Sequence, residues 1–504
     1  MALSSDGGFY MLKKLRFTII WVLALAMVIS FAGCSGKKDD SEDDQQSSSS
    51  NPVPPDLAGN ITISAYKSYE NDNDLFMYVQ DYTKQYPSVD VQVDAELSYD
   101  EYFATLDERI AKGQTGDVVL ISSDKLAEYV EKGWIRDLSN DANGIIDYTS
   151  SKFSKLYPAN VYMEAAYNTS LYDGRLYMCP VEYLNQVVIL NLDLLRKAGI
   201  ENPVPSDKWT WDDLLGYAEK LSESGVKTPV LMNYQDYAIW GSFAKGYGGS
   251  LYNEITFASK TTELNFTDPD VINGLKYLTD NFLRTGYAAD ITTSEVSSED
   301  LSQYGIIVAD HSDLIRWQNT LKQDVDNGGF DWEFAHFPGF VNEEGTVYKN
   351  IGVKTLGFAV INHEVIDAMN ENGNDIDKTD EEIQEEKEAL ENTVKNAKAL
   401  ALYAMVKDAS VSYCGELGYK VPALKSVNSM KFWREFPVSG KNTSVFSLYS
   451  EYDYPATLTS FMTWNASKEI KDRIVEIFEI YAKNPNLVYI DDLIQEIQNA
   501  ANAS

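Results

Sequence analysis

Cys34 is the residue whose surroundings most clearly specify a chemical reaction. It follows a nearly unbroken apolar run, Phe17 to Phe31, and the small residues Ala32 and Gly33, and basic residues precede the run at 13–16. An apolar run of this length is too short to span a bilayer stably, and with a positive flank it is typical of a cleaved export signal. A cysteine at the cleavage point offers a thiol that can be acylated with a diacylglyceryl group before the signal is removed.

This segment resembles a bacterial lipoprotein signal, although Phe31 stands where leucine is usual. The resemblance implies that residues 1–33 are a signal peptide and that the mature chain begins at Cys34 on the outer face of the cytoplasmic membrane. Two acyl chains on one cysteine give stable anchoring. A plain secreted protein with a coincidental cysteine is the alternative.

The residues beside the signal have no pattern of a folded domain. Residues 34–59 are lysines, a cluster of acids, serines and prolines, which cannot bury enough apolar surface to fold, so we expect a disordered tether. The signal is complete from Met11, so the sequence leaves open whether the chain starts at Met1 or at Met11.

The charge of the chain excludes some partners. The formal net charge is -35, with 77 acidic and 42 basic residues. Such a chain repels nucleic acid and anionic lipid, and self-association is disfavoured, so we expect a monomer that binds no nucleic acid.

After Cys34 the only cysteines of the sequence are Cys179 and Cys414. They either form one disulfide or are two buried small apolar residues.

Catalytic and metal-binding patterns are weak. The three histidines, His311, His336 and His363, are scattered and lack the paired spacing of a zinc helix. No Gly-x-Ser-x-Gly elbow occurs. Paired carboxylates remain as an enzyme alternative, because two acids suffice for a glycosidase. The sequence therefore predicts a protein that binds no cofactor and no metal and is not an enzyme.

The elements that follow the tether alternate between strand and helix. Residues 61–66 form a β-rich run, and apolar residues between 75 and 86 recur at helical spacing. Ser98 and Glu101 form a capping box, and the apolar run 117–121 suits a central strand. Strands separated by helices imply a mostly parallel sheet, whose ligands gather at the carboxyl ends of the strands.

The rest of the chain continues this pattern. The Asp173-Gly174 pair predicts a hairpin or a turn into an extended segment, and residues 187–190 predict a strand. Predicted helices follow at 191–199, from Thr210 to about Ser222, at 379–407 and at 468–482.

Several phrases, taken together and in order, resemble the extracellular solute-binding proteins of sugar-type ABC importers, the broad maltose-binding-protein-like group. The most specific phrase runs from Tyr172-Asp173-Gly174 through Asn191-Leu192-Asp193-Leu194-Leu195 to Trp209-Thr210-Trp211. The others are Thr115–Leu138, Tyr304–Asp310 with Trp317, Gly352–Val360 and Gly418–Ala423. The resemblance implies an α/β chain with a two-lobed, periplasmic-binding-protein type II-like fold and a ligand cleft between the lobes.

The resemblance also implies limits for the lobes and a motion. We expect residues 60–183 plus 305–362 in lobe 1, and 184–304 plus 363–504 in lobe 2. The lobes are expected to close about the crossovers near Tyr183, Gly305 and Ile361.

A sugar cleft needs flat aromatic rings and hydrogen-bond acceptors, so candidate ligand residues are those where loops leave the predicted strands. They are Tyr66, Ser68, Ser122, Ser123, Glu182, Tyr183, Asn185, Trp240, Asp310, His311, Asp313 and Tyr419. Each has a structural alternative: Tyr66 or Trp240 in the core, Ser123 or Asp313 as a helix cap, and His311 as a surface group. We place Trp240 in a loop-like stretch and expect Ser123 to cap a helix.

The predicted function is that of a lipid-anchored binding protein that captures a carbohydrate, such as an oligosaccharide, and delivers it to the permease subunits of an ABC transporter. One alternative is a surface glycoside hydrolase or lyase. Another keeps the fold but binds a polyamine or peptide, or acts as a sensor. The sequence does not specify the identity, linkage or length of the sugar.

Overall fold

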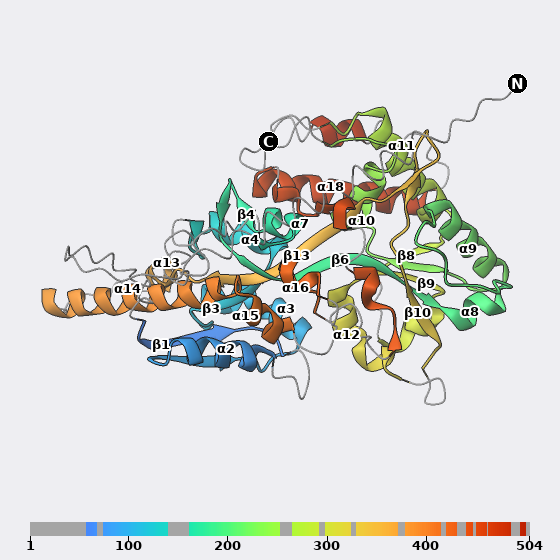
Figure 1. Ribbon diagram of the computed structural model, residues 1–504. Coiled ribbons are helices and arrows are strands. Elements are labelled where there is room, and N and C mark those ends of the chain that lie inside the picture. The colour runs from blue at the N-terminus through green and yellow to red at the C-terminus, as the bar shows by residue number, and fades with distance from the viewer. Residues whose placement is uncertain are drawn as a thin grey trace, which may run out of the picture. The chain divides into compact units, whose positions relative to one another are not determined.

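The computed structural model describes most of the chain after the tether (Figure 1). The described residues are 57–67, 74–139, 161–251, 265–291, 298–323, 329–370, 379–414, 420–430, 440–446, 450–460, 462–484 and 494–499. Residues 52–504 form one compact unit. The signal, Cys34 and the tether up to residue 56 lie outside the described residues.

Strands and helices alternate in the first part of this unit. The elements are β1 (Gly59–Ser64), α2 (Asp74–Gln85), β2 (Val89–Asp94), α3 (Tyr99–Ala111), β3 (Val118–Ser122) and α4 (Ser123–Glu131). β1 pairs in parallel with β2 and β3. The predicted capping box is confirmed: Ser98 accepts from the Glu101 amide, and Glu101 accepts from the Ser98 amide.

A tight hairpin leads into the centre of the fold. It follows α7 (Glu164–Thr169) and consists of β4 (Leu171–Tyr172) and β5 (Arg175–Leu176). Asp173 and Gly174 have φ values of 51° and 71°, so both residues adopt the left-handed conformation of a type I′ turn. The predicted Asp-Gly hairpin is confirmed.

Two long strands, β6 (Cys179–Asn191) and β13 (Ile351–Val360), run side by side through the middle of the sheet (Figure 1). The first half of β6 pairs with β13, and the second half pairs with β9 (Ile306–Asp310) and β10 (Trp332–Ala335). The sheet order is β2-β1-β3-β13-β6-β9-β7-β8. Because β6 is buried along its whole length, it reads as an apolar strand with a few polar residues.

The middle of the chain adds helices around the second half of the sheet. They and their strands are α8 (Leu192–Lys197), α9 (Trp211–Glu223), β7 (Val230–Met232), α10 (Tyr237–Ala244), α11 (Pro269–Leu278), β8 (Ala288–Asp290) and α12 (His311–Leu321). The later elements are β11 (Phe340–Val341), β12 (Val347–Tyr348), α13 (His363–Asn370), α14 (Asp380–Tyr403), α15 (Lys407–Cys414), α16 (Lys425–Asn428), β14 (Asp453–Pro455) and α18 (Trp464–Lys483).

Two hydrophobic cores cover the sheet. The first joins β1, β3 and β13 to α2 and α14, with Tyr78 and Leu400 at its centre. The second joins β7 to α9, α10 and α18 and contains Trp211 and Phe478. Neighbouring residues of β9 alternate between the cores, because successive side chains of a strand point to opposite faces.

The α/β fold predicted from the sequence is confirmed, and the helices expected at 379–407 and 468–482 correspond to α14 and α18. The expectation of a mostly parallel sheet is wrong, because the long central strands β6 and β13 pair antiparallel with each other and with β9 and β3. The limits of the two lobes remain a proposal. Because β9 pairs with β7, we propose that residues 306–310 belong to lobe 2, together with residues 184–304. α14 packs on β1, β3 and β13, and this packing favours assigning the helix to lobe 1.

Both later cysteines are buried free thiols in the first core. Of the two sequence alternatives, the structure therefore has two small apolar core residues and no bond between them. Among the residues that the structure describes, no helix has both the length and the apolar character needed to cross a membrane.

Candidate functional site

A polar pocket lies on the sheet at the carboxyl ends of β3, β7 and β9, and we call it the central pocket. Its lining residues are Tyr99, Ser122, Asp124, Leu184, Gln186, Asn233, Asp236, Ile239, Val308, Asp310, Ser312, Asp313, Arg316 and Lys354. They come from both halves of the sheet, because the pocket sits where β6 passes from pairing with β13 to pairing with β9. This is the edge at which open α/β sheets bind their ligands.

Three helices begin at the central pocket, and each is capped by a residue that lines it. Ser122 caps α4, Asp236 caps α10 and Asp310 caps α12. The short polar side chains accept from first-turn amides, which would otherwise lack partners. The positive ends of three helix dipoles therefore meet at this pocket, each with an acidic residue at its start.

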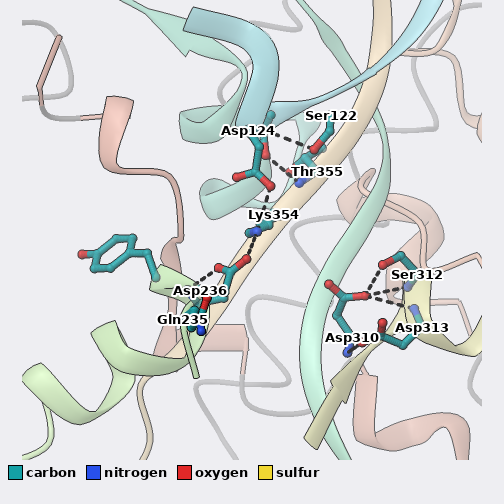
Figure 2. A network of polar contacts seen from close by, with 12 residues as sticks. Ser122, Asp124, Gln235, Asp236, Asp310, Ser312, Asp313, Lys354 and Thr355 are labelled. Atoms are coloured by element: carbon teal, nitrogen blue, oxygen red, sulfur yellow. Dashed lines mark hydrogen bonds and ion pairs between the residues drawn. The ribbon is translucent and has the colours of Figure 1, made fainter. Parts of the chain in front are cut away.

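Lys354 on β13 connects two of these helices. Its ammonium lies 2.8 Å from Asp124 Oδ2 and donates a second hydrogen bond to Asp236 (Figure 2). Burial would lower the pKa of Lys354, but the two carboxylates raise it well above its ordinary value. Burial raises the pKa of Asp236, and Lys354 opposes that rise.

On the other side of the pocket, Asp310 and Asp313 form the capping box of α12. Asp310 Oδ1 accepts from the Ser312 amide, the Ser312 hydroxyl and the Asp313 amide (Figure 2). Asp313 accepts from the Asp310 amide and from Arg316 Nη1 at 2.7 Å. Burial and the charge of Asp310 raise the pKa of Asp313 to about 7, although Arg316 opposes the rise.

Gln186 is a buried polar residue of the pocket whose side chain lacks a protein partner among the described residues. Its side chain is only 6% exposed and lines the pocket, yet its amide makes no hydrogen bond to any residue that the structure describes. Gln186 stands directly opposite Asp310 in the antiparallel pairing of β6 with β9, so the two side chains share one face of the sheet. The amide of Gln186 is thus available to a ligand or to water in the pocket.

A second, larger cavity adjoins the first, and we call it the outer pocket. The two cavities share Asp124, Asp236 and Lys354 as lining residues. The other residues of the outer pocket are Lys125, Glu128, Tyr237, Trp240, Ala456, Thr457, Leu458, Thr459, Trp464, Ser467, Lys468, Lys471 and Asp472. The outer pocket has a volume of about 460 Å³ and the central pocket about 220 Å³. Together the two volumes fall in the range of ligand pockets.

Three of the predicted ligand residues instead form a buried polar cluster in and beside the first core. Glu182 accepts hydrogen bonds from the hydroxyls of Tyr66 (3.0 Å) and Tyr413 (2.6 Å), and His311 Nε2 lies 3.3 Å from Glu182 Oε2. Burial acts to raise the pKa of Glu182, but His311, Lys420 and the Tyr413 hydroxyl outweigh it and hold the pKa below its ordinary value. In this cluster two tyrosine hydroxyls donate to the one buried carboxylate, that of Glu182.

The structure distributes the other predicted residues as follows. Ser122, Asp310 and Asp313 line the central pocket, and Trp240 lines the outer pocket. Trp240 is wrongly expected in a loop: it lies on α10, is 1% exposed and contacts other rings of the second core, because this stretch is apolar on all sides.

Three further predicted residues are buried against other segments. Tyr183 donates to the carboxylate of Asp453, and Asn185 Nδ2 donates to the Phe446 carbonyl. Ser123 accepts from the Thr355 amide and is the first residue of α4, so the expectation that it caps this helix is wrong by one position.

Ser68 and Tyr419 lie outside the described residues. The ligand roles of all twelve predicted residues remain predictions.

Sequence reasoning missed Gln186, Asp124, Asp236 and Lys354, which line the central pocket. Two of them carry a signal in the sequence. Gln186 and Lys354 are polar residues within strands whose other members are mostly apolar, and such residues need a reason to be buried.

The described residues contain no group of three or more histidine, cysteine or acidic side chains able to hold a metal ion. The carboxylates of the central pocket are instead engaged in helix caps and ion pairs. The arrangement is suited to hydrogen bonding with a polar ligand.

Known proteins resemble this chain in sequence and in fold. Residues 75–304 match the family described as bacterial extracellular solute-binding protein. An ABC substrate-binding protein from Listeria monocytogenes, solved in complex with cycloalternan, superposes with a TM-score of 0.61 at 20% identity, covering 88% of this chain and 98% of that one. The cyclic alpha-maltosyl-1,6-maltose binding protein from Arthrobacter globiformis gives a TM-score of 0.60 at 15% identity, with the same coverages of 88% and 98%. These likenesses show the two-lobed α/β binding-protein fold.

Curated relatives match over shorter stretches. A putative binding protein of Brucella abortus is 25% identical over 170 residues, which are 31% of this chain and 36% of that protein. The sn-glycerol-3-phosphate-binding periplasmic protein of Escherichia coli is 33% identical over 95 residues, 19% of this chain and 20% of that protein. The chain thus spans about a third or less of the length of these relatives. The family description places its members outside the cytoplasm. The match over residues 75–304, together with the shared fold, makes this chain similar to the bacterial extracellular solute-binding proteins.

Proposed function

We propose that this protein is a lipid-anchored binding component of an ABC importer that captures a carbohydrate, such as an oligosaccharide, and delivers it to the membrane permease. The central pocket is the proposed binding site, and the outer pocket extends it. No covalent chemistry is proposed for the protein itself.

The observation that carries this proposal is the polar lining of the central pocket. Hydroxyls, amides and carboxylates from three helix starts and two strands converge there, and the buried amide of Gln186 is left without a protein partner. A ligand with many hydroxyl groups can supply both donors and acceptors to such a lining. Tyr99 and, in the outer pocket, Trp464 offer aromatic rings for the C–H faces of a sugar.

The solved relatives support the same class of ligand. The Listeria protein was solved with cycloalternan, and the Arthrobacter protein is named for binding cyclic alpha-maltosyl-1,6-maltose. The Escherichia coli relative is named for sn-glycerol-3-phosphate. A phosphate is disfavoured in the central pocket, because four aspartates line it against one lysine and one arginine.

A thermal-shift panel tests the proposal. The purified full-length chain is heated with neutral oligosaccharides, amino-oligosaccharides, amino acids, peptides and glycerol-3-phosphate. Ligand at 100 times its dissociation constant stabilises the native state by about 2.7 kcal/mol, so a binding sugar should raise the melting temperature clearly. A response to peptides or to glycerol-3-phosphate, with none to any oligosaccharide, would overturn the carbohydrate proposal.

Cys34 supplies the proposed anchor, and the high negative charge favours a monomer. A surface hydrolase or lyase is the competing function. Incubation of the chain with polysaccharides followed by product analysis separates the two, since release of new reducing ends would exclude pure binding.

A further inference from the structure

The carboxylates of the central pocket outnumber its cations. Asp124, Asp236, Asp310 and Asp313 line it with Lys354 and Arg316. The formal charge of the lining is therefore two negative charges in excess. The pocket is polar and partly closed to water, where electrostatic interactions are stronger than in bulk solvent.

The two cations are already taken by three of these four acids. Lys354 pairs with Asp124 and Asp236, and Arg316 pairs with Asp313 and also with Asp100 on α3. Asp310 has no cation within ion-pair distance among the described residues. Its hydrogen-bond donors are two backbone amides and one hydroxyl, all of them neutral.

These neutral donors use one oxygen of Asp310 only. Oδ1 accepts all three hydrogen bonds, and no described residue donates to Oδ2. In Figure 2 this second oxygen points away from Ser312 and Asp313. The first-turn amides of α12 donate to Oδ1 and supply no donor for this second oxygen.

Gln186 gives an independent sign that a ligand belongs at this place. It faces the pocket from the strand position opposite Asp310, it is more than nine-tenths buried, and its amide has no partner among the described residues. A carboxylate oxygen and an amide without partners, side by side, form a small recognition site for a group rich in hydrogen-bond donors.

We infer that the central pocket selects a carbohydrate that carries a protonated amino group, which the free oxygen of Asp310 and the side-chain oxygen of Gln186 hold together. The carbohydrate part of this inference rests on the proposed function, and the amino group rests on the charge and geometry of the pocket. An ammonium ion fits because it supplies three donors and the missing positive charge.

The state of Asp313 provides a second readout. The groups that face it are Asp310 and Arg316 on its own segment, Lys354 on β13, and Tyr99 and Asp100 on α3. Burial and the nearby charge of Asp310 raise the pKa of Asp313 to about 7. A bound cation lowers that pKa, so binding of an amine should release up to about half a proton per molecule at pH 7.

Titration calorimetry tests the inference with four probes on the full-length chain: a glucosamine tetramer, an N-acetylglucosamine tetramer, maltotetraose and spermidine. We expect the glucosamine tetramer to bind at least about tenfold more tightly than the two neutral oligomers, since charged hydrogen bonds are the stronger ones. Repeating the titration in buffers of different ionisation enthalpy should reveal a released proton when the glucosamine tetramer binds and none when the two neutral oligomers bind.

Two variants locate the effect. Asp310→Asn keeps a good helix cap but removes the charge, and Gln186→Leu removes the amide without breaking any protein hydrogen bond. Both should weaken binding of the glucosamine tetramer about tenfold and leave the melting temperature of the unliganded protein nearly unchanged. The matched control is Asp268→Asn, which alters the cap of α11 outside both pockets and should leave binding unchanged.

The outcomes separate this inference from the proposed function. Neutral oligomers that bind as tightly as the glucosamine tetramer, or an Asp310→Asn variant with unchanged affinity for it, would overturn the amine and leave the carbohydrate proposal intact. Binding of spermidine without any oligosaccharide would support the amine and overturn the carbohydrate. If none of the four probes binds, both the amine inference and the carbohydrate proposal are contradicted.

Discussion

Lys354 donates a hydrogen bond to Asp236, and the same Asp236 caps the first turn of α10. A residue in the long central strand β13 is thus joined to the helix that follows β7 in the other half of the sheet. Since Lys354 also pairs with Asp124 at the start of α4, one ammonium group connects elements of both halves and forms the wall shared by the two pockets.

Lys354→Met should destabilise the protein at neutral pH. The change leaves the partly buried Asp236 without its counter-charge, and a desolvated polar group that loses its partner costs about 1–3 kcal/mol. The raised pKa of Asp236 sets the sign of the pH effect: stability of the variant should fall further as the pH rises from 5 to 7.5, because ionisation of this buried acid is then unopposed.

Urea unfolding at both pH values measures this loss. Lys84→Met is the matched control, because Lys84 forms an exposed pair with Asp81 and should cost less than about 0.5 kcal/mol. Equal effects of the two substitutions would show that the Lys354 contact contributes no more than a surface pair.

Asp313 should make the protein less stable as the pH rises from about 4 to 7. The pKa of Asp313 is about 7 in the folded chain and about 3.9 in an unfolded one, so the folded state holds the proton more tightly between those values. Stability from this group is therefore full below pH 4 and is lost as the pH approaches 7.

The Asp313→Asn variant tests this slope, since asparagine cannot ionise. Its free energy of unfolding should change less between pH 4.5 and 7.5 than that of the parent chain. Asp270→Asn, at an exposed position in the first turn of α11, should run parallel to the parent. A parallel curve for Asp313→Asn as well would remove Asp313 from the pH response.

Trp240→Ala should lower the stability of the unliganded protein by about 3–5 kcal/mol, the usual cost of emptying a core aromatic site. Its ring is buried among core residues and its centroid lies 4.6 Å from that of Tyr237. Thermal or urea unfolding measures the loss. A variant as stable as the parent would show that the ring does not support the second core.

Trp464→Ala should act in the opposite way. This ring is only partly buried at the start of α18 and lines the outer pocket. We expect a stability change below about 1 kcal/mol, and a weaker affinity for oligosaccharides long enough to reach the outer pocket. Unchanged affinity for such oligomers, measured by calorimetry, would remove the outer pocket from the binding site.

Cys34→Ala should release the protein from membranes without unfolding it. The cysteine is the proposed acylation site, and it precedes a polar tether. Cell fractionation measures the released fraction, and the melting temperature of the released chain serves as the control. A variant that stays tightly membrane-bound after signal cleavage would contradict the lipoprotein proposal.

The sequence by itself determined the local structure and the fold class. Ser98 with Glu101 and Asp173 with Gly174 specify a helix start and a tight turn through contacts within a few residues, and both appear as predicted. The alternation of strands and helices specified an α/β sheet, because period and length are readable along the chain. Asp310 and Ser122 were placed at the pocket for the same reason: each ends a recognisable strand.

Only the tertiary structure decided which polar residues share the pocket and which are buried. Tyr66 donates to Glu182 and His311 lies 3.3 Å from the same carboxylate, across 116 and 129 positions of sequence, so this buried cluster follows from packing that no local pattern reveals. Gln186 and Lys354 reach the pocket because β6 changes partner from β13 to β9 between Asn185 and Gln186. Strand pairing over such distances depends on the whole sheet, and that is why the central residues of the site could not be read from the chain.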